Sequence, residues 1–170
     1  MIKALKAKSY KLKADYRGFT LIEIMTVLVV MVILSIITVV NLTQHRRKSD
    51  LDNAARQIVA TLREAESRSV SQQSSVSWGV RLSNVTNTAP FYALFMSSYS
   101  PSSTMGYYRL PPTVQYMTSS IAQGSSLDIT FAQISGAPST STSITLKLSG
   151  GGPGLVTSTI TVNANGLISF

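Results

Sequence analysis

Residues 17–40 read RGFTLIEIMTVLVVMVILSIITVV, and this stretch decides the fold prediction. From Phe19 to Val40 the sequence is a mainly apolar run of 22 residues with one charged side chain, Glu23. As a helix, at about 1.5 Å per residue, the run would be roughly 33 Å long, and the hydrocarbon core of a bilayer is about 30 Å thick. We therefore predict that residues 19–40 form a transmembrane helix.

Basic residues flank this run on both sides. Residues 1–18 contain six Lys and Arg residues and one acid, whereas Arg46, Arg47 and Lys48 follow the run. The more basic flank is expected to stay in the cytoplasm. This rule predicts a single-pass membrane protein, with its N-terminus inside and its C-terminus outside.

The helix is expected to continue beyond the membrane, because neither Gly nor Pro occurs between Phe19 and Trp78. Apolar or small residues recur at steps of four and three, which places them on one helical face: Leu51, Ala55, Ile58, Leu62 and Ala65. Two pairs of opposite charge, Asp52 with Arg56 and Glu64 with Arg68, have the i,i+4 spacing of helical ion pairs. Residues 41–73 are therefore predicted to be an amphipathic half of the same helix.

Residues 74–170 have a different pattern, in which short β-prone runs alternate with turn residues. The alternation of apolar and polar residues is typical of an antiparallel sheet that is covered on one face. The predicted fold class is α+β, with a long N-terminal spine helix, transmembrane in one half and amphipathic in the other, packed on an antiparallel β-sheet head. The predicted strands are 76–82, 91–97, 114–118, 127–132, 144–148, 157–162 and 167–170.

The segment Arg17-Gly18-Phe19-Thr20-Leu21-Ile22-Glu23, between a basic leader and an apolar run, resembles the processing site of type IV prepilins and type II secretion pseudopilins. The resemblance implies that a prepilin peptidase cuts between Gly18 and Phe19, so that residues 1–18 are a cleaved leader. It also implies N-methylation of the new amino group of Phe19. The head is faintly similar to H-type pseudopilins and T-type minor pilins.

Glu23 is the candidate for filament assembly. A carboxylate inside an apolar helix is unfavourable by several kcal/mol unless it is paired or lies near a polar boundary. One interpretation places Glu23 harmlessly at the level of the lipid headgroups, four residues from Phe19. The processing motif favours another, in which the carboxylate neutralises the Phe19 amino group of a neighbouring subunit.

The sequence offers few residues for catalysis or for binding metal ions or phosphate. Arg46, Arg47 and Lys48 could contact nucleic acid or lipid headgroups, and their position directly after the apolar run favours a basic cluster at the membrane surface. The single histidine, His45, has no metal-ligating neighbour in the sequence, and the Gly-rich residues 150–154 lack the Lys-Ser/Thr sequel of a phosphate loop. With no Cys and no catalytic constellation, we predict no enzyme activity, no cofactor and no metal site.

The leading hypothesis is a minor pilin or pseudopilin, a structural subunit of a type IV pilus-like or type II secretion filament. Its predicted partners are prepilin peptidase, other pilins or pseudopilins, and membrane lipid before assembly. An alternative is a DNA-binding minor pilin of a DNA-uptake machine, which would need a basic stripe on the head. The last 22 residues contain no charged side chain, which disfavours nucleic acid as a partner. A third hypothesis is a plain signal-anchored envelope protein.

Overall fold

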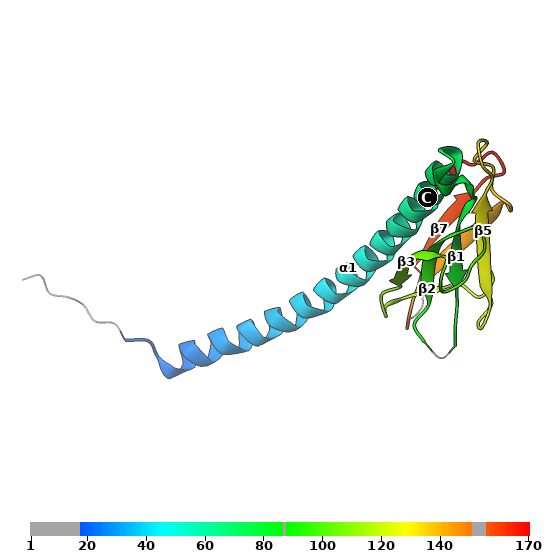
Figure 1. The fold of residues 1–170 in the computed structure, drawn as a ribbon. Coiled ribbons are helices and arrows are strands. Elements are labelled where there is room, and N and C mark those ends of the chain that lie inside the picture. The colour runs from blue at the N-terminus through cyan, green and yellow to red at the C-terminus, as the bar shows by residue number, and fades with distance from the viewer. Residues whose placement is uncertain (1–17, 87, 151–155) are drawn as a thin grey trace, which may run out of the picture. The chain divides into compact units, whose positions relative to one another are not determined.

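A computed structural model describes residues 18–86, 88–150 and 156–170, except for the side chains of residues 36–43 (Figure 1). The chain divides into two compact units, Met1–Asn41 and Leu42–Phe170, and each is described by itself. The predicted leader, apart from Gly18, and most of the Gly-rich turn at 150–154 lie outside the described residues.

The assigned helix α1 covers Leu21–Val70 and therefore contributes to both units. Within the described residues, no helix is long and apolar enough to cross a membrane. The predicted fold class, a long spine helix with a transmembrane half, is thus wrong on this point.

The unit Leu42–Phe170 contains two antiparallel sheets of four strands each, where a single sheet was predicted. The first sheet has the order β3-β2-β1-β5 and the second β4-β6-β7-β8. The strands are β1 (Trp78–Ser83), β2 (Phe91–Met96), β3 (Thr104–Arg109), β4 (Val114–Tyr116), β5 (Ser126–Phe131), β6 (Thr142–Leu148), β7 (Thr157–Val162) and β8 (Ile168–Ser169).

The change from the first sheet to the second occurs at Pro111-Pro112, between β3 and β4. Two consecutive prolines lack the N–H groups that a continuing ladder needs, so β4 does not return along β3 as a hairpin. Instead, β4 pairs with β6 in the second sheet, with Val114 opposite Leu148. The chain later returns to the first sheet, where β5 pairs with β1.

The later turns of α1 and both sheets share one hydrophobic core. The five residues whose spacing placed them on one helical face are all at most 1% exposed: Leu51, Ala55, Ile58, Leu62 and Ala65. They pack with the inward side chains of both sheets, among them Val80, Ile129, Ile144 and Ile160. Burial of this face holds the helix and the two sheets of this unit together, because each large apolar side chain removed from water stabilises by about 1.5–3 kcal/mol.

The turn from α1 into β1 is built around Trp78. The helix ends at Val70, a 3-10 turn follows (η1, Gln73–Ser75), and Gln72, Ser74 and Ser75 have φ values of +52°, +62° and +54°. The hydroxyl of Ser69 accepts a hydrogen bond from the backbone N–H of Trp78 at 2.8 Å, and the indole N–H donates to the carbonyl of Gln73 at 3.0 Å. These bonds anchor the first strand against the end of the helix.

Each predicted strand overlaps an observed one, but β3 was not predicted. Its sequence, Thr-Met-Gly-Tyr-Tyr-Arg, has no alternation of apolar and polar residues, because no residue of this edge strand is fully buried. Asn165 and Gly166 lie in the turn that joins β7 to β8, where Gly166 has φ +84°, a region that favours glycine.

Candidate functional site

The processing segment, defined as residues 18–23, is open to an approaching enzyme. Gly18 is exposed, and a Cβ atom added to it would meet no atom within 4 Å. Phe19 is 79% exposed. The predicted scissile peptide between Gly18 and Phe19 is therefore unobstructed on the described residues, which is the access that cleavage by a peptidase needs.

Thr20 caps the start of α1, a role that the analysis of the sequence missed. The backbone N–H of Glu23 donates to Thr20 Oγ1 at 3.3 Å, and the Thr20 carbonyl accepts from the N–H groups of Glu23 and Ile24 at 3.1 and 3.3 Å. The signal was present as Thr-x-x-Glu, the pattern of a capping box, with Phe19 and Ile24 at the positions of a hydrophobic staple. Glu23 thus lies in the first turn of α1, where a negative charge is favourable to the helix dipole.

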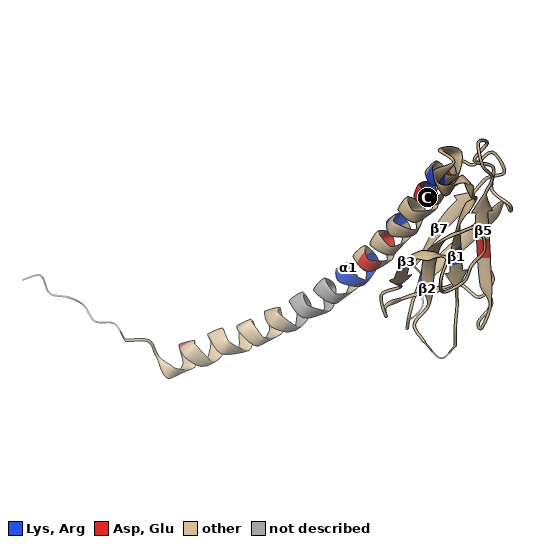
Figure 2. Ribbon diagram, viewed as in Figure 1, with Lys and Arg blue, Asp and Glu red and all other residues tan. Residues whose placement is uncertain are grey.

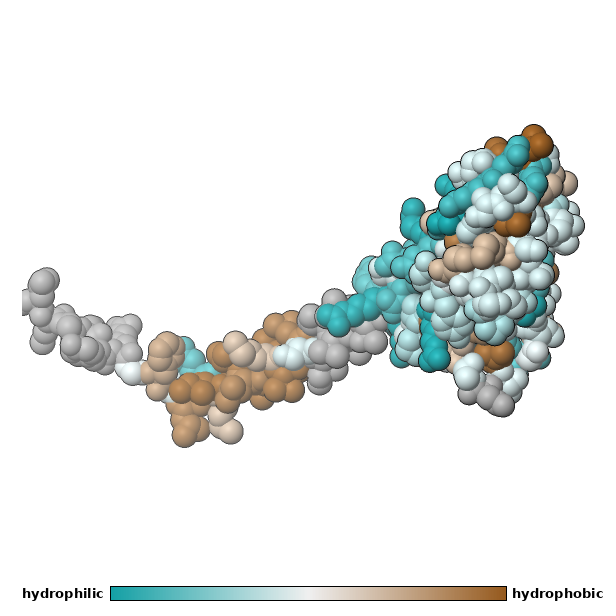
Figure 3. Space-filling view, viewed as in Figure 1, coloured by the Kyte–Doolittle hydropathy of each residue, from teal (hydrophilic) through white to brown (hydrophobic). Residues whose placement is uncertain are grey.

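An apolar surface follows directly on the processing segment. The large apolar residues between Phe19 and Leu34 are 52–79% exposed, and Figure 3 shows them as a brown patch on this part of α1. Two hydroxyl side chains in this stretch bond to the preceding turn, Thr26 Oγ1 to the carbonyl of Glu23 at 2.8 Å and Ser35 Oγ to that of Met31 at 2.7 Å. Because these hydroxyls are satisfied within the helix, they add little to the free-energy cost of moving the segment into apolar surroundings.

Glu23 is the only charged residue from Gly18 to Ser35. Its carboxylate is exposed, and it forms no hydrogen bond or ion pair with the residues that the structure describes. Among the described residues of the chain the carboxylate therefore has no cation to neutralise it. It lies one helical turn from the residue whose amino group cleavage would release, which keeps the predicted pairing between two chains sterically possible.

The basic cluster Arg46, Arg47 and Lys48 lies on α1 just before the buried residues begin at Leu51. All three side chains and His45 are exposed, and none forms an ion pair with another described residue. Within the described ranges no group of three His, Cys, Asp or Glu side chains is placed to hold a metal ion. In Figure 2 the ribbon of the later turns of α1 alternates between blue stretches of basic residues and red stretches of acidic residues.

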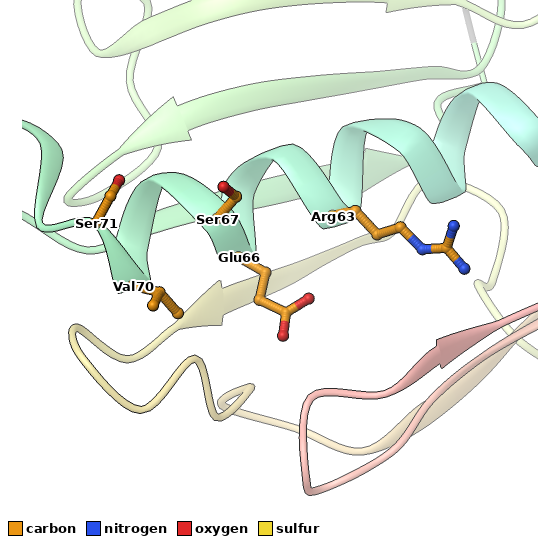
Figure 4. Close-up of a pocket in the computed structure, with 5 residues that line it drawn as sticks. All are labelled: Arg63, Glu66, Ser67, Val70 and Ser71. Carbon is orange, nitrogen blue, oxygen red and sulfur yellow. The ribbon is translucent and has the colours of Figure 1, made fainter.

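The unit Leu42–Phe170, called the β-rich unit from here on, has a shallow cleft of about 390 Å³ beside the last turns of α1 (Figure 4). The cleft is lined by Arg63, Glu66, Ser67, Val70 and Ser71. Arg63 and Glu66 point from the helix toward the hairpin that ends in β8, and Arg63 Nη2 donates to the carbonyl of Ile168 at 3.0 Å. No described hydrogen bond links either serine hydroxyl to a base. The cleft therefore lacks an activated nucleophile, and Arg63 serves to tie the helix to the second sheet.

Arginines of the β-rich unit are held by aromatic rings and acids. Arg81 donates two hydrogen bonds of 2.6 Å to the carboxylate of Asp128, and its guanidinium lies 3.9 Å from the ring centroid of Tyr99. Donation of these hydrogen bonds to Asp128 raises the pKa of Arg81, although burial acts in the opposite direction. Arg68 pairs with Glu64 at 2.6 Å and lies over the ring of Trp78.

Of the two predicted helical ion pairs, only Glu64 with Arg68 forms among the described residues. Arg56 lies over the ring of Phe170, 5.1 Å from its centroid, and makes no ion pair with Asp52. Among the described arginines, Arg68 and Arg81 are therefore each paired with a carboxylate, whereas Arg56 is not.

Comparisons with protein-family models, with curated proteins and with solved structures find no significant match to this chain. The resemblance of residues 17–23 to a prepilin processing site therefore remains a prediction from the sequence.

Proposed function

We propose that this protein is a structural subunit, a minor pilin or pseudopilin, of a type IV pilus-like or type II secretion filament. The observation that carries the proposal is the exposed apolar surface of α1 directly after an unobstructed Gly18–Phe19 peptide. Soluble monomers rarely expose a continuous apolar surface of this extent, and such surfaces mark sites of association with protein or membrane. The β-rich unit, by contrast, has its own complete core.

Association of several chains through this surface would supply the energy of assembly. Each large apolar side chain that leaves lipid for a bundle of like helices would gain van der Waals packing, and not the free energy of leaving water. More than ten such side chains lie in residues 19–34. These packing contacts would favour the bundle over separate chains in lipid.

Glu23 would set the axial position of each subunit. Cleavage after Gly18 would expose a positive amino group on Phe19, and N-methylation would leave that charge in place. In a bundle with a low dielectric constant, the carboxylate of a neighbouring chain is the group that can neutralise it. Only one stagger of two chains brings these groups together, because Glu23 is the only charge on the described apolar segment.

The proposal includes the earlier steps implied by the motif. Prepilin peptidase is the proposed processing partner, and lipid of the bacterial cytoplasmic membrane is the proposed environment of the apolar segment before it joins other pilins or pseudopilins outside that membrane. We propose neither a catalytic function nor a cofactor for this chain.

Because the chain contains no Cys, single cysteines can report assembly without interference. Val27→Cys and Val30→Cys place a thiol on the apolar segment, and Ser98→Cys places one on an exposed loop as the matched control. In cells with an active assembly machine, mild oxidation should yield covalent dimers in the sheared filament fraction for the first two variants and not for the control. Absence of the chain from that fraction while leader cleavage proceeds would contradict the proposed function.

A further inference from the structure

The outermost strand of the first sheet, β3, has a free edge. It pairs with β2 and with no other strand in the described part of the chain. Three large side chains on it are about half exposed: Met105 at 51%, Tyr107 at 47% and Tyr108 at 45%. A strand with one unpaired row of backbone N–H and C=O groups and exposed apolar side chains is a template for a further strand.

The other three sheet edges are protected. The edge of β5 is partly covered by the chain that follows it, since the N–H of Ala132 donates to the carbonyl of Ala137 at 2.8 Å and that of Ser139 to Thr130 at 2.7 Å. Strands β4 and β8 have three and two residues, too short to accept a long partner. Strand β3 has six residues and contains neither Pro nor Lys, and the irregularity in its pairing with β2 lies near its start, so that residues 106–109 pair regularly.

The aromatic side chains of β3 are held in place by rings on β2. Tyr107 lies against Phe91, with ring centroids 4.7 Å apart, and Tyr108 stacks on Tyr92 at 5.1 Å. Tyr92 is itself fixed, because it is buried and its hydroxyl bonds to Gln57 Oε1 at 3.3 Å. Rings that are ordered before binding lose little entropy when a partner covers them.

The positive charge of Arg109, at the end of β3, favours a partner strand that carries an acidic residue. Arg109 is exposed and forms no ion pair with another described residue, so a partner strand would gain from a carboxylate beside it. This chain does not offer one from its own strands, because Asp128 is the only acid after Glu66 and both of its oxygens bind Arg81. A second copy is therefore a poor match.

We propose that the free edge of β3 binds an extended segment of a different protein, which adds as a fifth strand to the first sheet. The segment would carry apolar side chains at alternate positions, to contact Tyr107, and an acidic residue beside Arg109. In this mode the backbone hydrogen bonds give affinity and the side-chain contacts give specificity. The inference does not depend on the filament function, because no residue of β3 belongs to the apolar segment of α1.

Hydrogen exchange measured by mass spectrometry on the full chain in detergent micelles tests this proposal. The probes are two capped six-residue peptides in which valine alternates with glutamate in one and with lysine in the other. The acidic peptide should slow exchange of the amides of residues 104–109, and it should bind roughly two- to fivefold more tightly than the basic peptide, as expected for one exposed ion pair. Arg109→Glu should reverse this preference.

Two variants distinguish strand addition at β3 from nonspecific binding of the peptides to exposed apolar side chains. Tyr107→Lys should abolish the protection of residues 104–109 by both peptides, whereas Leu167→Lys, an equally drastic change at another exposed apolar side chain, should leave it intact. Unchanged protection of β1 in the same spectra shows that each variant is folded. No protection of β3 by the acidic peptide, or equal protection by both peptides in wild type and Arg109→Glu, would overturn the proposal.

Discussion

The backbone N–H of Glu23 donates a hydrogen bond to the side-chain oxygen of Thr20, 3.3 Å away, so Thr20 caps the first turn of α1. The backbone of Glu23 therefore takes part in the helix start, whereas its side chain has the proposed role between subunits. Variants at the two positions can distinguish these roles, because a cap acts in the single chain and the proposed ion pair acts only in an assembly.

Thr20→Ala removes the capping oxygen and should weaken the first helical turn by about 1 kcal/mol. Thr20→Ser keeps the oxygen and is the matched control. Amide exchange of residues 21–25 in the full-length chain should be roughly fivefold faster in Thr20→Ala than in wild type and near wild type in Thr20→Ser. Equal exchange in all three proteins would show that the cap does not stabilise the helix start.

Gly18→Val places a branched side chain at the predicted cleavage site and should block removal of residues 1–18. Nothing in the described structure obstructs the new side chain, so folding should be unaffected and the effect should arise in the peptidase. Mass spectrometry of the intact protein from cells with an active prepilin peptidase should find only the uncleaved species. Ala14→Val, a similar enlargement away from the scissile peptide, should still be cleaved. A wild-type chain that retains Met1 in such cells would refute the processing prediction.

Glu23→Ala should leave leader cleavage intact and reduce incorporation into filaments. Loss of one member of a buried ion pair typically destabilises by about 3–5 kcal/mol, because the Phe19 amino group would remain without a partner. Glu23→Gln preserves the size and the capping-box pattern but removes the charge, so it should show the same defect. Immunoblots of sheared filament fractions measure the effect. If both variants enter filaments at the wild-type level, the pairing account is wrong.

Residues 49–170 should bind double-stranded DNA no better than a neutral protein of similar size. This part of the chain has six Lys and Arg residues against five acids, and Arg68 and Arg81 are each bonded to a carboxylate. DNA affinity depends chiefly on unpaired basic groups that contact phosphates. A mobility-shift assay at two salt concentrations checks this expectation, and salt-sensitive micromolar binding would favour the DNA-uptake hypothesis.

Asp128→Asn should lower the free energy of unfolding by about 1 kcal/mol, because it removes the charge that holds Arg81 across β1 and β5. The expected change in the free energy of unfolding is small because the side chains of Arg81 and Asp128 are both about a third exposed to solvent. Denaturant unfolding at neutral pH measures the change. Asp52→Asn, which removes a carboxylate that has no ion-pair partner among the described residues, is the control and should have a smaller effect. Equal effects of the two changes would show that the Arg81 pair adds nothing to stability.

The sequence by itself determined the features that depend on local spacing. The steps of four and three from Leu51 to Ala65 identified the buried helical face, because 3.6 residues per turn bring these positions to one side. Short β-prone runs located the strands of both sheets except β3. The processing segment and Glu23 were also found from sequence, and their functional roles remain predictions.

Only the tertiary structure decided how these elements pair and which charges are neutralised. The division into two sheets follows from the break at Pro111-Pro112 and from the long-range pairing of β5 with β1, which no local pattern encodes. Arg81 and Asp128 are 47 residues apart and meet only because β1 and β5 are neighbours. Strand β3 escaped prediction because alternation requires one buried and one exposed face, and an edge strand with no fully buried residue does not show it.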